Sequence, residues 1–317
     1  MRSLYLGRRS RHVPAKLVID TDIGEDIDDI LVTAFALASP EFEVVGITTV
    51  DGDTKARSRI ARRVTAAYGQ PEIPVAAGFV HSMPRADRDV APGTAVTQGD
   101  LAPDESGLPP ACELAADELI AKLAAEHRGE VYVLTIGAMT NVGQAVVRFP
   151  EDVKNLRGVV TNGGVFGRGR TAIGWNLRYD PLAALVVACS SVPWVLLPEN
   201  TMRLAGLKEE HVRRLEGANL PTTELLAKAI RLWRKNKPDA AKWPHLSDLN
   251  VFAYLMGGWL EVEAGRAMLK VAPDRRAELA VERDPAGPHA LGSEVPKQRA
   301  PELRELFMKR ILRPPAR

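Results

Sequence analysis

Short apolar runs alternate along the chain with longer stretches in which apolar residues recur every three or four positions. The short runs have the length of buried β-strands, and the longer stretches have the spacing of one apolar face on an α-helix. The predicted strands cover residues 17–19, 42–49, 131–136, 157–161 and 193–197, with two more near 268–271 and 277–281. The predicted helices cover residues 54–68, 111–127, 208–216, 222–235 and 301–312, and a further helix starts near residue 27. We therefore predict an α/β fold with an open, mostly parallel sheet, helices on both faces and extra helices near the C-terminus.

Six carboxylates lie at the turn after the first predicted strand, namely Asp20, Asp22, Glu25, Asp26, Asp28 and Asp29. In an open α/β sheet such a turn lies at the carboxyl ends of the strands, where ligands bind. Like charges about 4 Å apart repel by roughly 1 to 4 kcal/mol per pair, and a bound cation would relieve this repulsion. Carboxylates without nearby His or Cys favour Ca²⁺ or Mg²⁺, and a flexible set of about six to eight oxygens favours Ca²⁺. The alternative is a solvated acidic turn in which Asp26 caps the helix.

Composition adds few limits to this picture. The chain has 317 residues, of which 45% are hydrophobic and 26% charged, so it can bury a large core. The formal net charge of +2 gives no reason to expect a nucleic-acid partner. The basic side of the helix at residues 54–68 is typical of an ordinary solvated face.

The sequence shows no sign of a membrane or disulfide-rich protein. No apolar run approaches the ~18 residues of a membrane span, and no signal peptide is visible. Cys112 and Cys189, placed within one predicted helix and at the end of another, offer no disulfide framework. We expect a cytoplasmic protein without a membrane partner, with a flexible basic tail over residues 1–15 and a single domain over residues 16–317.

The acidic turn resembles a known family signature. The sequence DTDIGEDIDD at residues 20–29 is similar to the DTDPGxDD motif of the inosine-uridine preferring nucleoside hydrolases, with Ile23 in place of Pro and two extra residues. Later stretches resemble further motifs of that family in the same order, which are TTVxGN at 48–53, GPLTN at 137–141, EFN…DPEAA at 174–184 and HDP at 247–249. Within them, Thr140 or Asn141 can cap a helix, and Asp180 followed by Pro is typical of another helix start.

This resemblance implies a Rossmann-like fold and the calcium-dependent hydrolysis of the N-glycosidic bond of a ribonucleoside or related N-riboside, which gives ribose, or a ribose derivative, and free base. The implied Ca²⁺ ligands are Asp22, Asp29, Asp248 and the backbone carbonyl of Ile136. Asp22 would also be the base that takes a proton from water. The substrate-binding residues that we assign are Asp28, Asp53, Asn162, Trp175 and Asn176. Because members of the family form dimers and tetramers, we expect a homodimer or homotetramer.

The sequence departs from the family pattern where residues would assist the leaving base and hold the far end of the sugar. His245 becomes the candidate acid for the leaving base, because a family His next to Asp248 is replaced by Ser. Arg168 stands where the family has an Asn that holds the 5′-hydroxyl, and Gly174 replaces a Glu. With Arg170 and Arg178 close in sequence, guanidinium groups could bind a substrate modified at C5′, such as a nucleoside 5′-monophosphate. The alternative is a solvated, arginine-rich loop.

Two other functions agree with parts of the sequence. A strand that ends in DxD resembles the start of haloacid dehalogenase-type phosphatases, with Asp20 as nucleophile and Asp22 as acid. The downstream Lys and second acidic pair of that family are not evident. The missing His and Glu would also fit a nucleoside- or ribose-binding protein that keeps the metal site without the chemistry. Product release from a broad panel of nucleosides separates this binding protein from a hydrolase.

Overall fold

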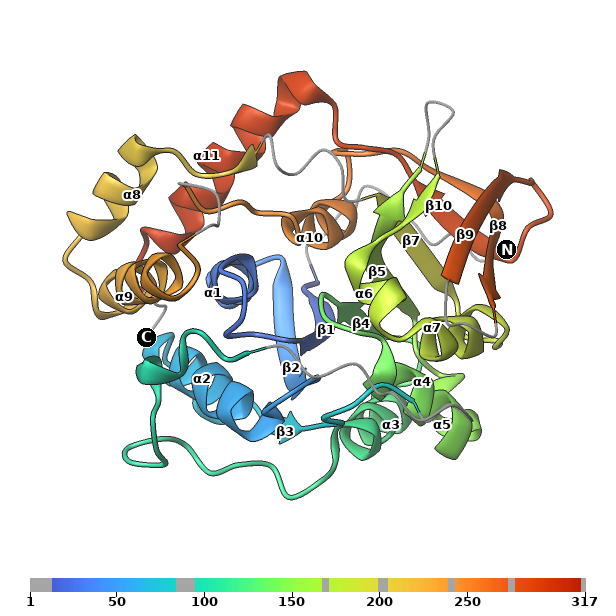
Figure 1. Cartoon of the computed structure of the whole chain (residues 1–317), viewed down its shortest axis with the longest axis horizontal. Coiled ribbons are helices and arrows are strands. Elements are labelled where there is room, and N and C mark those ends of the chain that lie inside the picture. The colour runs from blue at the N-terminus through green and yellow to red at the C-terminus, as the bar shows by residue number, and fades with distance from the viewer. Residues whose placement is uncertain are drawn as a thin grey trace.

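The predicted strands line up in one sheet (Figure 1). The computed structural model describes residues 13–83, 95–166, 171–198, 205–238, 243–272 and 277–314. The strands are β1 (Ala15–Thr21), β2 (Phe42–Thr49), β3 (Val75–Ala77), β4 (Val131–Thr135), β5 (Gly158–Val165), β6 (Ala172–Ile173), β7 (Trp194–Pro198), β8 (Val262–Val271), β9 (Ala277–Arg283) and β10 (His289–Gly292). In the described ranges these ten strands form a sheet of order β3-β2-β1-β4-β5-β7-β10-β8-β9, with β6 paired to β5. The predicted α/β class with a mostly parallel sheet is confirmed.

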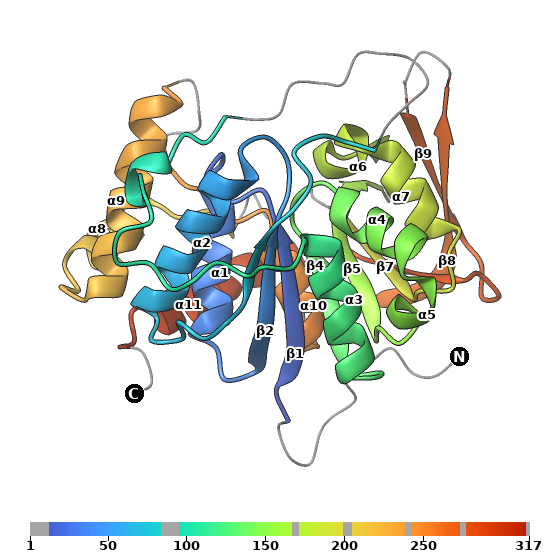
Figure 2. The same cartoon turned by 90° about the horizontal axis from the view of Figure 1, so that it is seen from below.

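Helices cover both faces of this sheet (Figures 1 and 2). They are α1 (Asp28–Leu37), α2 (Thr54–Ala67), α3 (Ala116–Glu126), α4 (Thr140–Arg148), α5 (Pro150–Val153), α6 (Trp175–Tyr179), α7 (Pro181–Ala188), α8 (Glu209–Glu216), α9 (Pro221–Asn236), α10 (Leu249–Met256) and α11 (Ala300–Ile311). One hydrophobic core joins the sheet to α1, α2, α9, α10 and α11, and a second joins it to α3, α4 and α7. Alternate residues of β1 enter the two cores, since Leu17 and Ile19 belong to the first and Val18 to the second. Among the described residues, no helix is long and apolar enough to cross a membrane.

The strand order reverses at β1. β1 lies between β2 and β4, and all three strands are parallel. The chain continues from β1 through β2 to β3 on one side, and from β4 through β5 to β7 on the other. In open α/β sheets, ligands bind in the crevice at the carboxyl ends of the two strands at which the order reverses, here β1 and β4. Because Asp20, one residue before the end of β1, pairs with Thr135 at the end of β4, the acidic turn after β1 lies at this crevice.

Differences from the predicted elements arise at glycines and in short segments. The sequence predicts a glycine-rich loop from residue 162, but β5 continues through Gly163. A Cβ at Gly163 would lie 2.6 Å from Leu196 Cδ1, so this strand needs glycine to pack closely against β7. The helix predicted from residue 111 begins at Ala116, which leaves Cys112 in the preceding loop. β3 and β6 have three and two residues, which is too short for a recognisable pattern.

Two predicted helix starts have opposite outcomes. Asp180 caps α7, because its Oδ1 accepts a hydrogen bond of 3.0 Å from the backbone N–H of Ala183. Capping of α4 by Thr140 or Asn141 is wrong, because Met139 is the N-cap residue. Asn141 Nδ2 instead donates to Asp20 Oδ1 at 2.7 Å, which ties the start of α4 to the end of β1.

Candidate active site

A pocket of about 330 Å³ opens at the carboxyl ends of β1, β4 and β5. It is lined by Asp22, Glu25, Asp26, Asp28, Asp29, Ile136, Asn162, Trp175, Asn176, His245, Ser247 and Asp248. This set contains every predicted site residue that the structure describes except Asp53. Asp53 is exposed and caps α2, where its Oδ1 accepts a hydrogen bond of 2.9 Å from the backbone N–H of Ala56. Arg168 and Arg170 lie outside the described residues.

Three buried carboxylates converge in this pocket. Oxygen atoms of Asp28, Asp29 and Asp248 all lie within 4.8 Å of one another. Burial, followed by the charges of Asp22 and Asp28, raises the pKa of Asp29 well above its ordinary value. The pKa of Asp248 is raised in the same way by burial and by the charges of Asp28 and Asp29. The donor set fits a hard cation such as Ca²⁺, which would offset this concentration of buried negative charge.

Asp22 stands next to this cluster at the start of the acidic turn. Its carboxyl lines the pocket, and its charge raises the pKa of both Asp29 and Asp248. Burial raises the pKa of Asp22 itself to about 7. A carboxylate with such a pKa is suited to accept a proton near neutral pH.

Neighbouring polar side chains hold the cluster in position. Asn162 Nδ2 donates to Asp248 Oδ1 at 3.0 Å and to the backbone carbonyl of Ser247 at 3.2 Å. The same amide accepts a hydrogen bond of 3.1 Å from Asn250 Nδ2. We assign Asn162 to substrate binding from the sequence. In the structure it therefore also fixes Asp248, the carboxylate of the cluster that is most distant along the sequence.

Asn176 and the carbonyl of Ile136, predicted to act separately on substrate and metal, contact each other. Asn176 Nδ2 donates to the Ile136 carbonyl oxygen at 2.8 Å. A carbonyl oxygen has two lone pairs, so it can accept this bond and still contact a cation. The bond attaches α6 to the carboxyl end of β4.

His245 lies between two carboxylates of the pocket. Its Nδ1 is 3.2 Å from Asp28 Oδ2 and 2.9 Å from Ser247 Oγ, and its Nε2 is 3.3 Å from Asp26 Oδ1. The Asp28 charge is the main cause that raises the pKa of His245 to about 11. This imidazole is therefore a protonated group in the pocket, as a proton donor to a leaving base must be.

The alternative role of Asp26 as a helix cap is wrong. Asp26 does not cap α1, because Ile27 is the N-cap residue.

Arg57 is a supporting residue that the sequence reasoning missed. It lies on α2 with a fully buried side chain, so the interpretation of the basic side of this helix as a solvated face is wrong at this position. Arg57 Nη1 donates to the Ile23 carbonyl at 3.0 Å and to the Asp22 carbonyl, which fixes the backbone of the acidic turn. Its spacing of three, four and seven residues before Ile60, Ala61 and Val64 would have placed it on the apolar face of the helix.

Trp175 forms an exposed part of the pocket lining. Its side chain lies at the start of α6 and is 53% exposed. The guanidinium of Arg178 lies 4.9 Å from the centre of the indole ring, within the range of a cation–π interaction. An exposed aromatic ring beside polar groups suits a flat heterocycle such as a nucleobase.

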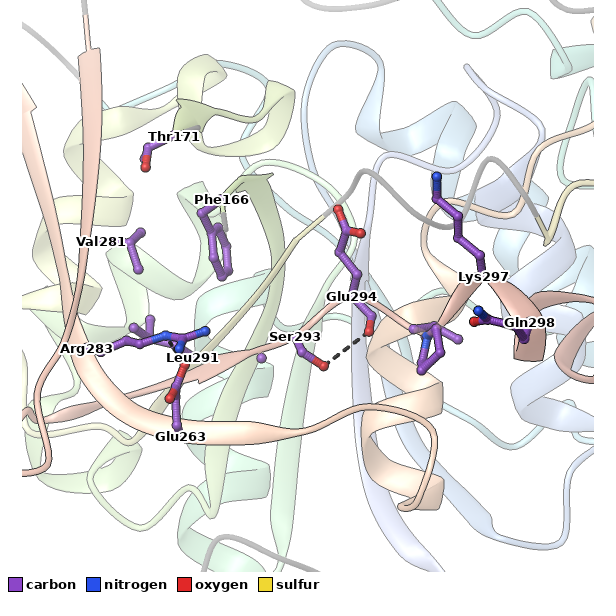
Figure 3. Close-up of a pocket in the computed structure, with 13 residues that line it drawn as sticks. Phe166, Thr171, Glu263, Val281, Arg283, Leu291, Ser293, Glu294, Lys297 and Gln298 are labelled. Carbon is purple, nitrogen blue, oxygen red and sulfur yellow. Dashed lines mark hydrogen bonds and ion pairs between the residues drawn. The ribbon is translucent and has the colours of Figure 1, made fainter. Parts of the chain in front are cut away.

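A larger cavity of about 790 Å³ lies between the end of β5, the β8–β9 hairpin and the segment after β10 (Figure 3). At one end of it Arg283 pairs with Glu263, and Glu294 and Lys297 lie at the other end. In the part of the chain that the structure describes, no group of three potential metal ligands converges there. We therefore assign the chemistry to the smaller pocket, where the carboxylates gather.

Comparison with known proteins finds similarity to nucleoside hydrolases. A family model described as inosine-uridine preferring nucleoside hydrolase matches residues 17–305. An uncharacterized protein of Schizosaccharomyces pombe is 32% identical over 212 residues, which are 63% of this chain and 66% of that protein. The pyrimidine-specific ribonucleoside hydrolase RihA of Citrobacter koseri is 29% identical over 234 residues, which are 72% of this chain and 73% of RihA.

Solved structures share the fold. A plant nucleoside hydrolase, the PpNRh1 enzyme, matches with a TM-score of 0.77 over 95% of this chain and 100% of that one, at 22% identity. A purine-preferring ribonucleoside hydrolase from Gardnerella vaginalis matches with a TM-score of 0.76 over 94% of this chain and 98% of that one, at 21% identity.

Proposed function

The chain belongs to the inosine-uridine preferring nucleoside hydrolase family, and we propose that it hydrolyses the N-glycosidic bond of a ribonucleoside with the help of Ca²⁺, giving ribose and free base. The observation that carries the finer part of this proposal is the convergence of Asp28, Asp29 and Asp248 beside Asp22. With the carbonyl of Ile136, Asp22, Asp29 and Asp248 are the groups that would hold the cation, and Asp28 beside them would bind a ribose hydroxyl. Bound there, Ca²⁺ would orient a water and lower its pKa.

Side chains of the pocket would supply the other parts of this reaction. Cleavage passes through an oxocarbenium-like state and needs a base for water and an acid for the leaving group. Asp22, with its pKa raised to about 7, would accept the proton of the attacking water. His245, protonated between two carboxylates, would donate a proton to the leaving base. Asn176 would bind a ribose hydroxyl, and Trp175 would pack against the base.

The phosphatase alternative disagrees with the position of Asp20. This residue is fully buried and is not part of the pocket lining. Its Oδ1 accepts hydrogen bonds of 2.7 Å from Thr48 Oγ1 and from Asn141 Nδ2, so it braces the ends of three elements. A nucleophile must reach the substrate, which Asp20 does not.

A nucleoside 5′-monophosphate is the second candidate substrate. Arg178 lies against the pocket residue Trp175, and Gly174 at the start of α6 leaves no carboxylate to repel an anion there. If this substrate is the right one, kcat/KM is higher for a 5′-phosphorylated nucleoside than for the same nucleoside without the phosphate. A native preference for the free nucleoside excludes it.

The experiment that tests the proposed hydrolase measures release of base from purine and pyrimidine nucleosides and their 5′-monophosphates. Asp22→Asn keeps the shape of the side chain but removes the base, so kcat should fall by about 10²-fold or more. Asp20→Asn is the matched control outside the pocket and should retain much more activity. Absence of hydrolysis together with binding of nucleosides would support a non-catalytic binding protein instead.

A further inference from the structure

The two sides of the pocket belong to separate elements that a chain of buried and half-buried contacts connects. The acidic turn follows β1, whereas Trp175 and Asn176 lie on α6. We propose that Tyr179, at the end of α6, is a positioning residue that sets the place of this helix relative to the acidic turn. This inference rests on the proposed function, in which Asn176 binds the sugar and the acidic turn holds the cation.

The first link of this chain is the guanidinium of Arg57. It contacts the backbone carbonyls of the acidic turn, as described above, and its Nε donates to the Asp51 carbonyl at 2.7 Å. One buried side chain therefore joins the turn after β1 to the turn after β2. A fully buried cation requires a partner charge, and Asp51 Oδ2 lies 3.8 Å from Arg57 Nη2.

The second link is Asp51, which has an unusual backbone conformation. Its φ of 69° lies in the left-handed region, which costs a residue other than glycine some stability. This conformation is over-determined by the surroundings, because both the carbonyl and the carboxylate of Asp51 bind neighbours. The side chain is 3% exposed, so its two oxygens face protein groups.

The third link is the hydroxyl of Tyr179, which donates a hydrogen bond to Asp51 Oδ1. Burial and this bond to the carboxylate raise the pKa of Tyr179, so the hydroxyl keeps its proton and remains a donor. A bond to a buried charged acceptor is stronger than one between neutral groups. Arg57, Asp51 and Tyr179 thus connect the acidic turn to α6 without passing through the substrate space.

The length of α6 makes this link important for Asn176. The helix has five residues, so Asn176 and Tyr179 are separated by less than one turn. Asn176 attaches α6 to β4 through the Ile136 carbonyl, and Tyr179 attaches it to the turn after β2. These two hydrogen bonds tie α6 to β4 and to the turn after β2, in addition to the buried side chain of Leu177. Without the Tyr179 bond the C-terminal end of α6 has more freedom to move, and Asn176 then binds the sugar less tightly.

The test compares native protein with Tyr179→Phe, which removes the hydroxyl and keeps the ring. Tyr132→Phe is the matched control, because it removes a hydroxyl that accepts a 2.9 Å hydrogen bond from Arg157 Nε near the opposite end of the sheet. Hydrolysis of p-nitrophenyl β-D-ribofuranoside and of uridine and inosine gives kcat and KM. For Tyr179→Phe we expect KM to rise about tenfold with a much smaller change in kcat, and for Tyr132→Phe we expect no change in KM.

Two further measurements separate positioning from a general loss of stability. Amide hydrogen exchange should become faster in α6 of Tyr179→Phe and remain unchanged in residues 20–29. The rise in melting temperature on adding Ca²⁺ should equal that of the native protein, because Arg57 still holds the acidic turn. Unchanged KM and unchanged exchange in α6 overturn the positioning role, and so does a loss of the Ca²⁺ response. If the native protein hydrolyses none of the ribosides, the proposed function fails, and the exchange in α6 still decides the role of Tyr179.

Discussion

Replacing Asp248 by Asn removes one charge from the carboxylate cluster and keeps an oxygen that can accept the hydrogen bond from Asn162. The oxygens of Asp28, Asp29 and Asp248 lie within 4.8 Å of one another. At an effective dielectric constant of about 20, this distance corresponds to roughly 3.5 kcal/mol for a fully charged pair. Burial and the neighbouring charges raise the pKa values of Asp29 and Asp248, so these carboxyls keep a proton more readily than free ones, which relieves part of this repulsion. We therefore expect Asp248→Asn to stabilise the metal-free protein by about 1 to 3 kcal/mol.

The effect should reverse when Ca²⁺ is present. An ion at about 100 times its Kd stabilises the folded state by about 2.7 kcal/mol. The variant should gain much less, because it lacks the carboxylate of Asp248, one of the proposed Ca²⁺ ligands. Urea unfolding followed by circular dichroism, once with a chelator and once with Ca²⁺, measures both quantities. The same variant should lose hydrolytic activity.

Asp53→Asn is the control for charge removal alone. Asn caps a helix as well as Asp does, and Asp53 lies outside the pocket, so neither the metal-free stability nor the Ca²⁺ gain should change. The proposed cation site is refuted if Asp248→Asn is less stable than the native protein in chelator and still gains the full increase in stability from Ca²⁺. That result would mean that the cluster is a structural network and not a cation site.

The remaining predictions concern single groups. His245→Ala should lower kcat for inosine or uridine by about 10²-fold and leave p-nitrophenyl riboside hydrolysis nearly unchanged, because p-nitrophenolate departs without a proton; equal losses for both substrates would exclude His245 as the acid. In chelator, the free energy of unfolding should be higher at pH 5.5 than at pH 8. Burial raises the pKa of Asp20 and Asp22 to about 7 in the folded protein, so their stabilising protonated forms are fully present below about pH 4 and are lost as the pH rises through 7. Greater stability at pH 8 contradicts this assignment. Trp175→Ala should raise KM for nucleosides by about tenfold and leave the Ca²⁺ response unchanged; an unchanged KM would remove the ring from substrate binding.

Local patterns predicted much of the fold. The strand at 42–49 has the predicted boundaries because an apolar run buried in a sheet is a local signal. The acidic turn was also predicted from a local pattern, since six carboxylates within ten positions repel one another and need a compensating charge in any fold. The order of the family motifs along the chain also indicated which elements carry the residues on both sides of the site.

Long-range and side-chain details could not be predicted in the same way. Asp53 follows a family motif, yet its carboxylate caps its own helix, because a bond to the backbone three residues on is always within reach. The pairing of Arg57, Asp51 and Tyr179 spans more than a hundred residues, and single positions carry no sign of such partners. The place of Asp28 in the carboxylate cluster depends on side-chain directions, which spacing along the chain does not fix.

The distance along the chain between the acidic turn after β1 and Asp248 also has a consequence for how the protein is made. The acidic turn is synthesised early, whereas Asp248 follows Asp29 by more than two hundred residues. At a synthesis rate of about 5 to 20 residues per second, the first carboxylates leave the ribosome on the order of 10 to 45 seconds before the last ligand does. During that interval the nascent chain has the first carboxylates but lacks Asp248, so the proposed Ca²⁺ site would be complete, and Ca²⁺ would stabilise the fold, only after α10 has packed against the sheet. A product truncated before residue 248 would lack Asp248, so Ca²⁺ at the proposed site would stabilise it less than the finished chain.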